Sequence, residues 1–122
     1  MDWITFEFEK KQFKLDKRTL KAGGCFHFNK GEYKVESPKT TLKIRELTED
    51  FTDKDIFLDI GAHTGFMSLN TKGQVWAFEP YDETFGILVN NKILKQENDS
   101  LKTQVNNLKS VIGKTESSLA SV

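Results

Sequence analysis

The residues best suited to chemistry form one short turn with two glycines and a carboxylate. Residues 59–65 read D-I-G-A-H-T-G, and they follow an apolar run, I-F-L, that predicts a short buried strand. The next residues, F-M-S-L, can begin a helix. A strand, a glycine-containing turn and a helix form the start of a nucleotide-binding α/β unit.

Each residue type in this turn has a chemical use. Gly61 lets the chain turn sharply off the strand, and Gly65 lets the following helix pack closely. The helix N-terminus would offer free N–H groups to an anionic group. Asp59, at the strand end, can accept hydrogen bonds from a cationic or hydroxyl-bearing ligand. The turn therefore predicts close contact between backbone and ligand.

A second acidic residue, Glu79, ends the next apolar strand, which reads Q-V-W-A-F. It lies about twenty residues beyond the turn, the separation typical of an acid that binds a ribose. Its carboxylate can accept two hydrogen bonds from vicinal hydroxyls. No Gly-Lys-Ser/Thr triplet is present, so the loop does not match the phosphate cradle of nucleoside triphosphatases. The pattern favours a nucleoside ligand with an amino-acid moiety and little or no phosphate.

The elements that position these residues follow from the periodicity. Residues 1–40 alternate apolar and polar side chains between glycine-containing turns, which predicts short strands, and residues 40–51 predict a short helix. Residues 55–98 read as strand, turn, helix, strand and helix. The last helix has an N-terminal cap near Asp82 and is expected to run to about Lys95. Residues 1–50 are therefore expected to form a β-rich extension with a lead-in helix.

Residues 99–122 allow two interpretations. A third strand over residues 108–112, ended by Gly113, is the favoured one. The alternative is a helix that continues as a coiled coil, because leucine or isoleucine recurs every seventh residue. The members of that repeat are Ile87, Leu94, Leu101 and Leu108. Asparagine at two partner positions, Asn91 and Asn98, counts against the coiled coil.

Composition limits the classes of function. The chain has 122 residues, enough for one domain, and 18 basic side chains balance 18 acidic ones, so charge predicts no nucleic-acid partner. Its mean hydropathy is -0.52, and neither a membrane span nor a signal peptide is expected. A single cysteine, Cys25, excludes an internal disulfide and suits the cytoplasm. Two histidines without ligand spacing predict no metal site.

These motifs together resemble a known family. The runs I-F-L-D-I-G-A-H-T-G-F, V-W-A-F-E-P-Y-D-E-T-F and L-V-N-N are similar to class I S-adenosylmethionine-dependent methyltransferases of the FkbM type. The resemblance implies an α/β, Rossmann-like methyltransferase fold and methylation of a hydroxyl on a sugar or other small molecule. It implies that Glu79 holds the ribose of S-adenosyl-L-methionine. It also implies that the remaining cofactor-binding residues lie in the turn, with Asp59, Gly61 and Gly65 framing the methionine part and Ala62, His63 and Thr64 against the ligand.

The resemblance extends over part of the family's sheet. Complete members have seven strands, and this chain supplies the first, the second and, over residues 108–112, a third, whose Ile112 would border the adenine. Residues 51–122 are thus expected to be the N-terminal half of a cofactor domain that is truncated before its acceptor half. No catalytic base can be named.

An incomplete sheet would expose apolar surface and one edge of the strand at residues 56–60. The N-terminal strands could pair with that edge, a second chain could cover it, or the fold could be marginally stable. Two other functions remain open. One is a non-catalytic α/β binding module that self-associates through the heptad, and the other is a domain that binds another nucleoside ligand such as a dinucleotide.

Overall fold

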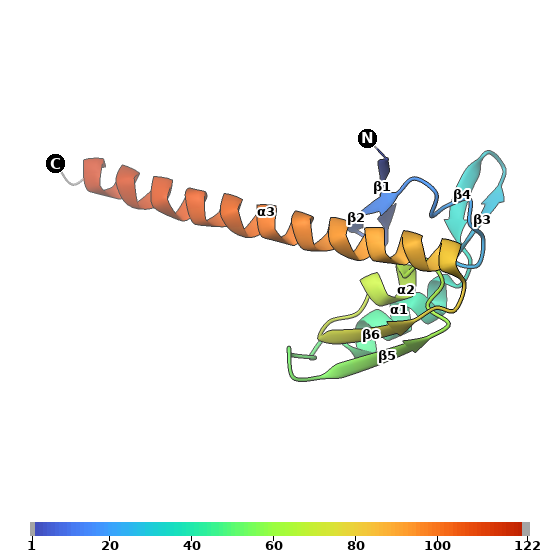
Figure 1. Ribbon diagram of the computed structural model, residues 1–122. Coiled ribbons are helices and arrows are strands. Elements are labelled where there is room, and N and C mark those ends of the chain that lie inside the picture. Colours follow the sequence, from blue (N-terminus) through green and yellow to red (C-terminus); the bar gives the residue numbers. More distant parts are fainter. Residues whose placement is uncertain (1, 121–122) are drawn as a thin grey trace.

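A computed structural model describes residues 2–120 as a mixed α/β body from which one long helix projects (Figure 1). Two antiparallel hairpins come first, and a parallel pair of strands follows them. The elements in chain order are β1 (Trp3–Phe8), β2 (Lys11–Asp16), β3 (Phe26–Asn29), β4 (Glu32–Val35), α1 (Pro38–Leu47), β5 (Ile56–Ile60), α2 (Phe66–Leu69), β6 (Gln74–Phe78) and α3 (Asp82–Ala120).

The two N-terminal hairpins have tight two-residue turns. β1 pairs with β2 in a register that joins Phe8 to Lys11, and the intervening Glu9 and Lys10 both have positive φ. β3 pairs with β4 around Lys30 and Gly31, which again have positive φ. Left-handed conformations at both central residues match the twist of a hairpin. The short N-terminal strands expected from the alternation are present in the structure.

The core forms around the ring of Phe66, the first residue of α2. Phe66 is 1% exposed, and Phe13 and Phe26 place their ring centroids 5.0 and 4.7 Å from its own. Phe6 and Phe8 add edge-on contacts at 6.0 and 5.9 Å. Aromatic pairs at such distances add favourable electrostatics to the burial of apolar area. The residue that follows the glycine turn is therefore anchored in a core built largely from the N-terminal hairpins.

Helix α1 overlaps residues 40–51, where a short helix was predicted, but it begins at Pro38 and ends at Leu47. Pro38 occupies its first turn, where a missing N–H costs nothing. Arg45 joins the helix to the rest of the body, since its guanidinium donates to Asn70 Oδ1 at 2.7 Å and to the carbonyl oxygens of Phe8 and Glu9. These bonds tie the connection before β6 to the first hairpin.

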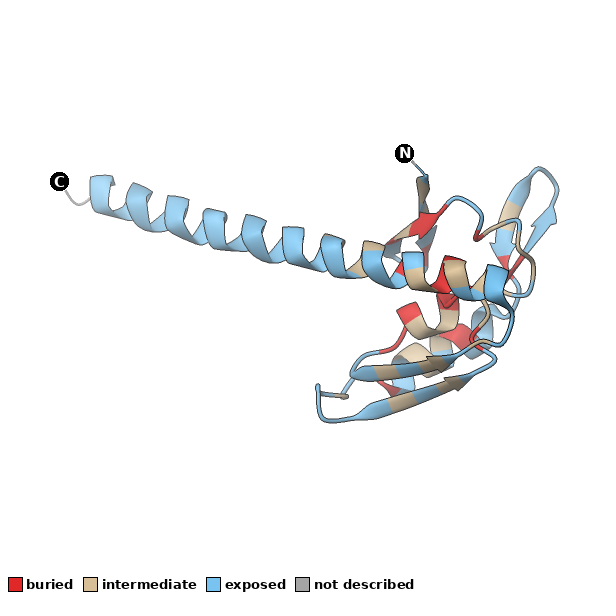
Figure 2. Ribbon diagram, in the orientation of Figure 1, coloured by how far each residue is buried: buried red, intermediate tan, exposed pale blue. Residues whose placement is uncertain are grey.

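Strands β5 and β6 form a parallel pair, and one of its two faces is open. The register sets Leu58 beside Trp76 and Ile60 beside Phe78, and all four side chains are more than half exposed. Alternate residues of both strands are half-buried and face the body, as the banding in Figure 2 shows. The expectation of a buried strand at residues 56–58 is therefore wrong for one face. The strand forms, but no element of residues 2–120 covers that face.

Within residues 2–120, β5 pairs with β6 alone. The N-terminal strands pair with each other and do not extend the parallel sheet. Of the three outcomes that the sequence left open, pairing of the N-terminal strands with the free edge does not occur. The exposed apolar surface expected of an incomplete sheet is present.

The C-terminal region differs from the favoured prediction. Helix α3 runs without interruption for 39 residues, so the third strand predicted over residues 108–112 is wrong, and so is a helix end near Lys95. In its polar stretch, Lys95 pairs with Asp99 one turn later at 3.1 Å, a spacing that favours a helix. The Thr103 hydroxyl donates to the Asp99 carbonyl at 3.1 Å. Gly113 lies inside the helix and does not end it.

None of the helices in the described part of the chain has the length and apolar character needed to cross a bilayer.

Candidate functional site

The glycine turn and Glu79 meet at the carboxyl ends of β5 and β6. The parallel register pairs Ile60 with Phe78, so the residues that follow these two strands are neighbours. The N–H groups of Gly61 and Ala62 both donate to the Phe78 carbonyl at 2.9 Å. The turn therefore folds over the end of β6. The structure thus brings together the two features that the sequence identified separately.

Glu79 is bound directly to the turn. Its Oε1 accepts from the backbone N–H of His63 at 2.9 Å, and its Oε2 accepts from the Thr84 hydroxyl at 2.9 Å and from the Tyr81 N–H at 3.2 Å. Burial raises the pKa of Glu79, but these three hydrogen bonds outweigh it and hold the pKa below its ordinary value. The carboxylate is therefore ionised at neutral pH.

The hydrogen bonds of Glu79 leave room for a ligand. A carboxylate has about four acceptor positions, two on each oxygen. Three of them are occupied in Glu79, two on Oε2 and one on Oε1, so one position on Oε1 is free. The Thr84 hydroxyl also lies 3.1 Å from the Tyr81 carbonyl. The Thr84 hydroxyl can therefore donate to the Tyr81 carbonyl instead of Glu79, which frees a second acceptor position on the carboxylate. Glu79 can therefore accept from two ligand hydroxyls.

Asp59 is the next-to-last residue of β5 and is half-buried on the face toward the body of the protein. Its Oδ2 accepts a short hydrogen bond from the hydroxyl of Ser68, which lies in α2. This bond fixes the carboxylate against the short helix. Because α2 is a single turn of four residues, it offers little of the helix dipole that the sequence led us to expect at this position. The charge at the turn comes mainly from Asp59 and Glu79.

The two glycines of the turn have different surroundings. Gly61 has a φ of 75° and is exposed, and an added Cβ would meet no atom within 4 Å. Gly65 has a φ of 87°, and an added Cβ would lie 3.2 Å from Leu88 Cγ in α3. Gly61 thus leaves backbone accessible from solvent, while Gly65 allows α3 to approach the turn.

The three residues between the glycines point mainly inward. Ala62 and Thr64 are 3% and 0% exposed, and the His63 ring lies against Gly24. The φ of His63 is 55°, which turns its N–H toward Glu79. A ligand at this turn would meet its backbone, and its side chains would act by holding that backbone in place.

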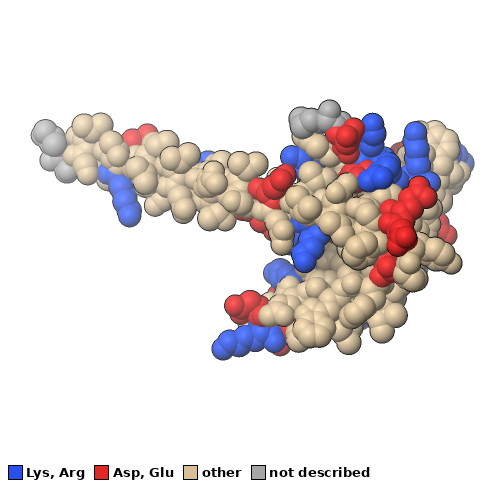
Figure 3. Space-filling view, viewed as in Figure 1, with Lys and Arg blue, Asp and Glu red and all other residues tan. Residues whose placement is uncertain are grey.

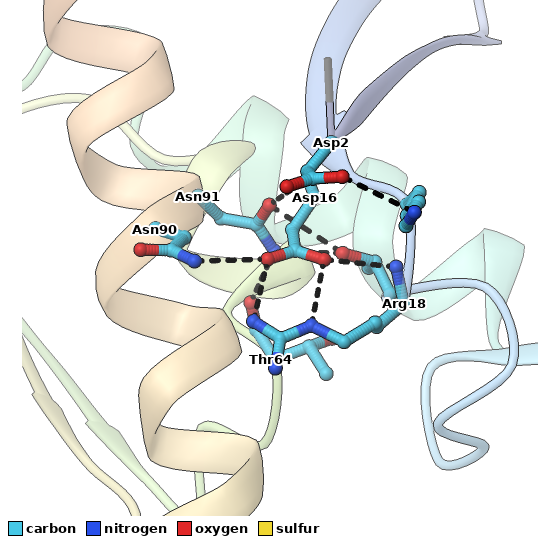
Figure 4. Close-up of polar contacts among 8 residues, drawn as sticks. Asp2, Asp16, Arg18, Thr64, Asn90 and Asn91 are labelled. Carbon is cyan, nitrogen blue, oxygen red and sulfur yellow. Dashed lines mark hydrogen bonds and ion pairs between the residues drawn. The ribbon is translucent and has the colours of Figure 1, made fainter.

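A buried polar network fixes the turn from behind (Figure 4). Asn91 of α3 donates to the Thr64 carbonyl at 2.8 Å and to the Thr19 hydroxyl at 3.0 Å, and its Oδ1 accepts from the Asp16 N–H at 2.7 Å. Asp16 in turn accepts from Arg18 at 2.7 Å and from Asn90 at 3.0 Å. The turn is thereby connected both to α3 and to the end of β2.

Three of these partners were not identified from the sequence. Ser68 binds Asp59, Thr84 binds Glu79, and Asn91 binds the turn. Thr84 has a local signal, because a hydroxyl in the first turn of a helix often caps nearby groups. Asn91 belongs to the L-V-N-N run and is a polar residue in an apolar repeat. Neither signal shows its partners, which lie far away in the chain.

The structure also describes the surroundings of the single cysteine and of the potential metal ligands. Burial raises the pKa of the Cys25 thiol, which opposes the thiolate form that a nucleophile needs. Among residues 2–120, no group of three His, Cys, Asp or Glu side chains lies close enough to hold a metal ion.

Comparison of the chain with models of protein families, with curated proteins and with solved structures finds no match. The likeness to FkbM-type methyltransferases therefore depends on the motifs quoted above alone.

Proposed function

We propose that this chain binds S-adenosyl-L-methionine at the turn of residues 59–65 and Glu79, as the cofactor-binding part of an FkbM-like methyltransferase. The observation that carries the proposal is the hydrogen bond between Glu79 and the turn, at the carboxyl ends of two parallel strands. Ligands of open α/β sheets bind at this end of the strands. Under this proposal, β5 and β6 are the first two strands of an incomplete Rossmann-like domain.

The residues present fit the chemical groups of this cofactor. Glu79 can accept hydrogen bonds from both ribose hydroxyls once the Thr84 hydroxyl turns to the Tyr81 carbonyl. The open space above Gly61 admits the amino-acid moiety close to the backbone. Asp59, held by Ser68, supplies negative charge for the ammonium group. No phosphate is required, in agreement with a turn that carries two carboxylates nearby.

When bound, S-adenosyl-L-methionine supplies a methyl group on a sulfonium centre. The residues of this chain would hold and orient it, and such positioning accounts for much of catalysis in methyl transfer. An acceptor hydroxyl of a sugar or other small molecule would also need a base to take its proton. None of the residues described at the site is assigned that role. We therefore expect binding by the 122-residue chain and no methyl transfer by it alone.

Calorimetric titration with S-adenosylhomocysteine tests the proposal, with NAD as the competing nucleoside ligand. We expect the wild-type chain to bind S-adenosylhomocysteine and not NAD. Glu79→Gln and Asp59→Asn should each weaken binding at least about 10-fold, since each removes a charged hydrogen-bond partner. Glu83→Gln is the matched control, because Glu83 is exposed in the first turn of α3 and should leave binding unchanged.

Circular dichroism of each variant would separate loss of binding from loss of folding. Absence of binding by a folded wild-type chain at millimolar S-adenosylhomocysteine would refute the proposal. Tighter binding of NAD would instead identify a dinucleotide site.

A further inference from the structure

The second half of α3 projects beyond the body of the protein (Figure 1). Every residue from 99 to 120 is exposed (Figure 2), and the whole helix is about 58 Å long at 1.5 Å per residue. Isolated helices gain little stability from propensity alone, and most depend on packing of an apolar face. A partner for this segment is therefore expected on physical grounds.

The projecting segment has an apolar stripe on one side. Its apolar members are about half exposed or more: Leu101, Val105, Leu108, Ile112 and Leu119. Together with Thr115, they follow alternating steps of four and three residues. The opposite side carries polar residues, among them Thr103, Ser110 and Lys114. Few charged side chains interrupt the surface of this segment in the view of Figure 3. Such a stripe is the contact surface of a two-stranded coiled coil.

The line of this stripe continues into the first half of α3, where the body of the protein covers it. Ile87 and Asn91 are buried, and Asn91 accepts from the backbone of β2. Asn98 is half-buried and lines a hollow with Gln12 and Phe13 of β2. In a parallel dimer, the first half of the partner's helix would need the space that β2 occupies. In an antiparallel dimer, the two bodies lie at opposite ends and do not collide.

We propose that residues 101–119 of two copies of this chain form an antiparallel coiled coil. In this register Leu101 packs against the partner's Leu119, and Leu108 packs against the partner's Ile112. Val105 meets the partner's Thr115. The twofold axis passes near residue 110, so every apolar residue of the stripe is buried in an isologous interface. This proposal is independent of the cofactor site.

The flanking positions are complementary in the same register. Lys102 lies beside the partner's Glu116, and the twofold symmetry repeats this contact, so the interface contains two ion pairs. Val111 lies beside the partner's Val111 at the axis, and this explains an apolar residue outside the stripe that is 60% exposed in the single chain. The two Lys109 side chains also approach each other near the axis, at a cost that their length and solvent reduce.

Sedimentation velocity over a range of concentrations tests whether the surface is used. We expect a monomer–dimer equilibrium for the wild-type chain. Leu108→Asp should weaken it at least about 100-fold, since it would bury an unpaired charge. Ser110→Asp, two residues away on the opposite side, is the matched control and should leave it unchanged.

A monomeric wild-type chain at 100 µM (about the upper end of such assays) would overturn the proposal. So would a dimer that survives Leu108→Asp and is lost in Leu58→Asp, which would place the contact on the open sheet face.

Cysteine cross-linking tests the orientation. In a Cys25→Ser background, Leu101→Cys and Leu119→Cys chains would each be oxidised alone and as a mixture. Residues 101 and 119 lie about 27 Å apart along one helix. An antiparallel dimer therefore gives a disulfide-linked species in the mixture and not in either chain alone. A disulfide in each chain alone would show a parallel dimer and overturn the proposed arrangement.

Discussion

The Oδ1 atom of Asn91 accepts a hydrogen bond of 2.7 Å from the backbone N–H of Asp16, which lies 75 positions earlier in the chain. The same side chain donates to the Thr64 carbonyl on its other side. One amide thus joins the first hairpin, the candidate cofactor turn and the long helix. No part of it is exposed to solvent, so water cannot replace these partners.

Asn91→Ala should therefore be strongly destabilising. It leaves the Asp16 N–H and the Thr64 carbonyl buried without a partner, and we expect the free energy of unfolding to fall by about 2–4 kcal/mol. Urea denaturation followed by circular dichroism measures the change. Asn90→Ala is the control, because Asn90 is exposed and makes one hydrogen bond to Asp16 at 3.0 Å. Equal effects of the two substitutions would contradict the role assigned to Asn91.

Asp16 should make the stability depend on pH in the acid range. Hydrogen bonds from Arg18 hold the pKa of Asp16 well below its ordinary value, and a hydrogen bond from Asn90 lowers it further by a smaller amount. Together they outweigh the effect of burial, which raises this pKa. The unfolded chain has a pKa of about 3.9 at this residue. Because the folded pKa is the lower one, the stabilisation is fully present above that value and is lost as the pH falls toward the folded pKa.

Urea denaturation at several pH values between 7 and 2.5 (about the range over which Asp side chains titrate) checks this prediction. Asp16→Asn should be clearly less stable than the wild type at pH 7, and the difference should shrink below about pH 4. Asp50→Asn, at an exposed position, is the control for the change of charge. A wild-type advantage over Asp16→Asn that stays constant down to pH 2.5 would argue against the prediction.

The part of the site that the sequence predicted is the part encoded locally. The turn of residues 59–65 and the strand that ends before Glu79 depend on neighbouring residues, so their pattern was sufficient. The role of Asn91 depends on Asp16 and Thr64, and no local pattern shows which distant groups a polar side chain will meet.

Two of the errors in the fold have a similar cause. Residues 108–112 contain Val111 and Ile112, which suit a strand, but a strand needs a neighbour to pair with, and within residues 2–120 the parallel sheet stops at two strands. The apolar run at residues 56–58 predicted a buried strand. It could not show that the face of Leu58 and Trp76 has no cover, because that depends on elements elsewhere in the chain.

The two glycines of the turn should respond differently to alanine. Both have positive φ, which costs an alanine about 1 kcal/mol. At Gly61 that is the whole cost, since the added Cβ meets nothing. At Gly65 the Cβ would also press on Leu88, a buried residue of α3, so we expect a total of about 2–3 kcal/mol.

Thermal and urea unfolding of Gly61→Ala and Gly65→Ala measure the difference. If Gly61→Ala proved the more destabilising of the two, the turn would have to pack differently from the arrangement described. The Gly61 substitution should in addition weaken binding of S-adenosylhomocysteine if the open space above this glycine admits the ligand.

The open face of β5 and β6 should be detectable in solution. Leu58 and Trp76 are 56% and 52% exposed and adjacent in the register, so they offer a contiguous apolar surface to a dye such as ANS. Leu58→Thr should lower ANS fluorescence and change the free energy of unfolding by less than about 0.5 kcal/mol, because the side chain is not packed and threonine suits a strand.

Val75→Thr is the matched control on the other face, where Val75 is half-buried and lines a hollow beneath α3 with Ala77. It should cost about 1–2 kcal/mol, since it places a hydroxyl in an apolar setting without a partner. If Leu58→Thr destabilised the protein as much as Val75→Thr, the face would be covered in solution, and the oligomer measured in the same buffer would show whether a second copy covers it.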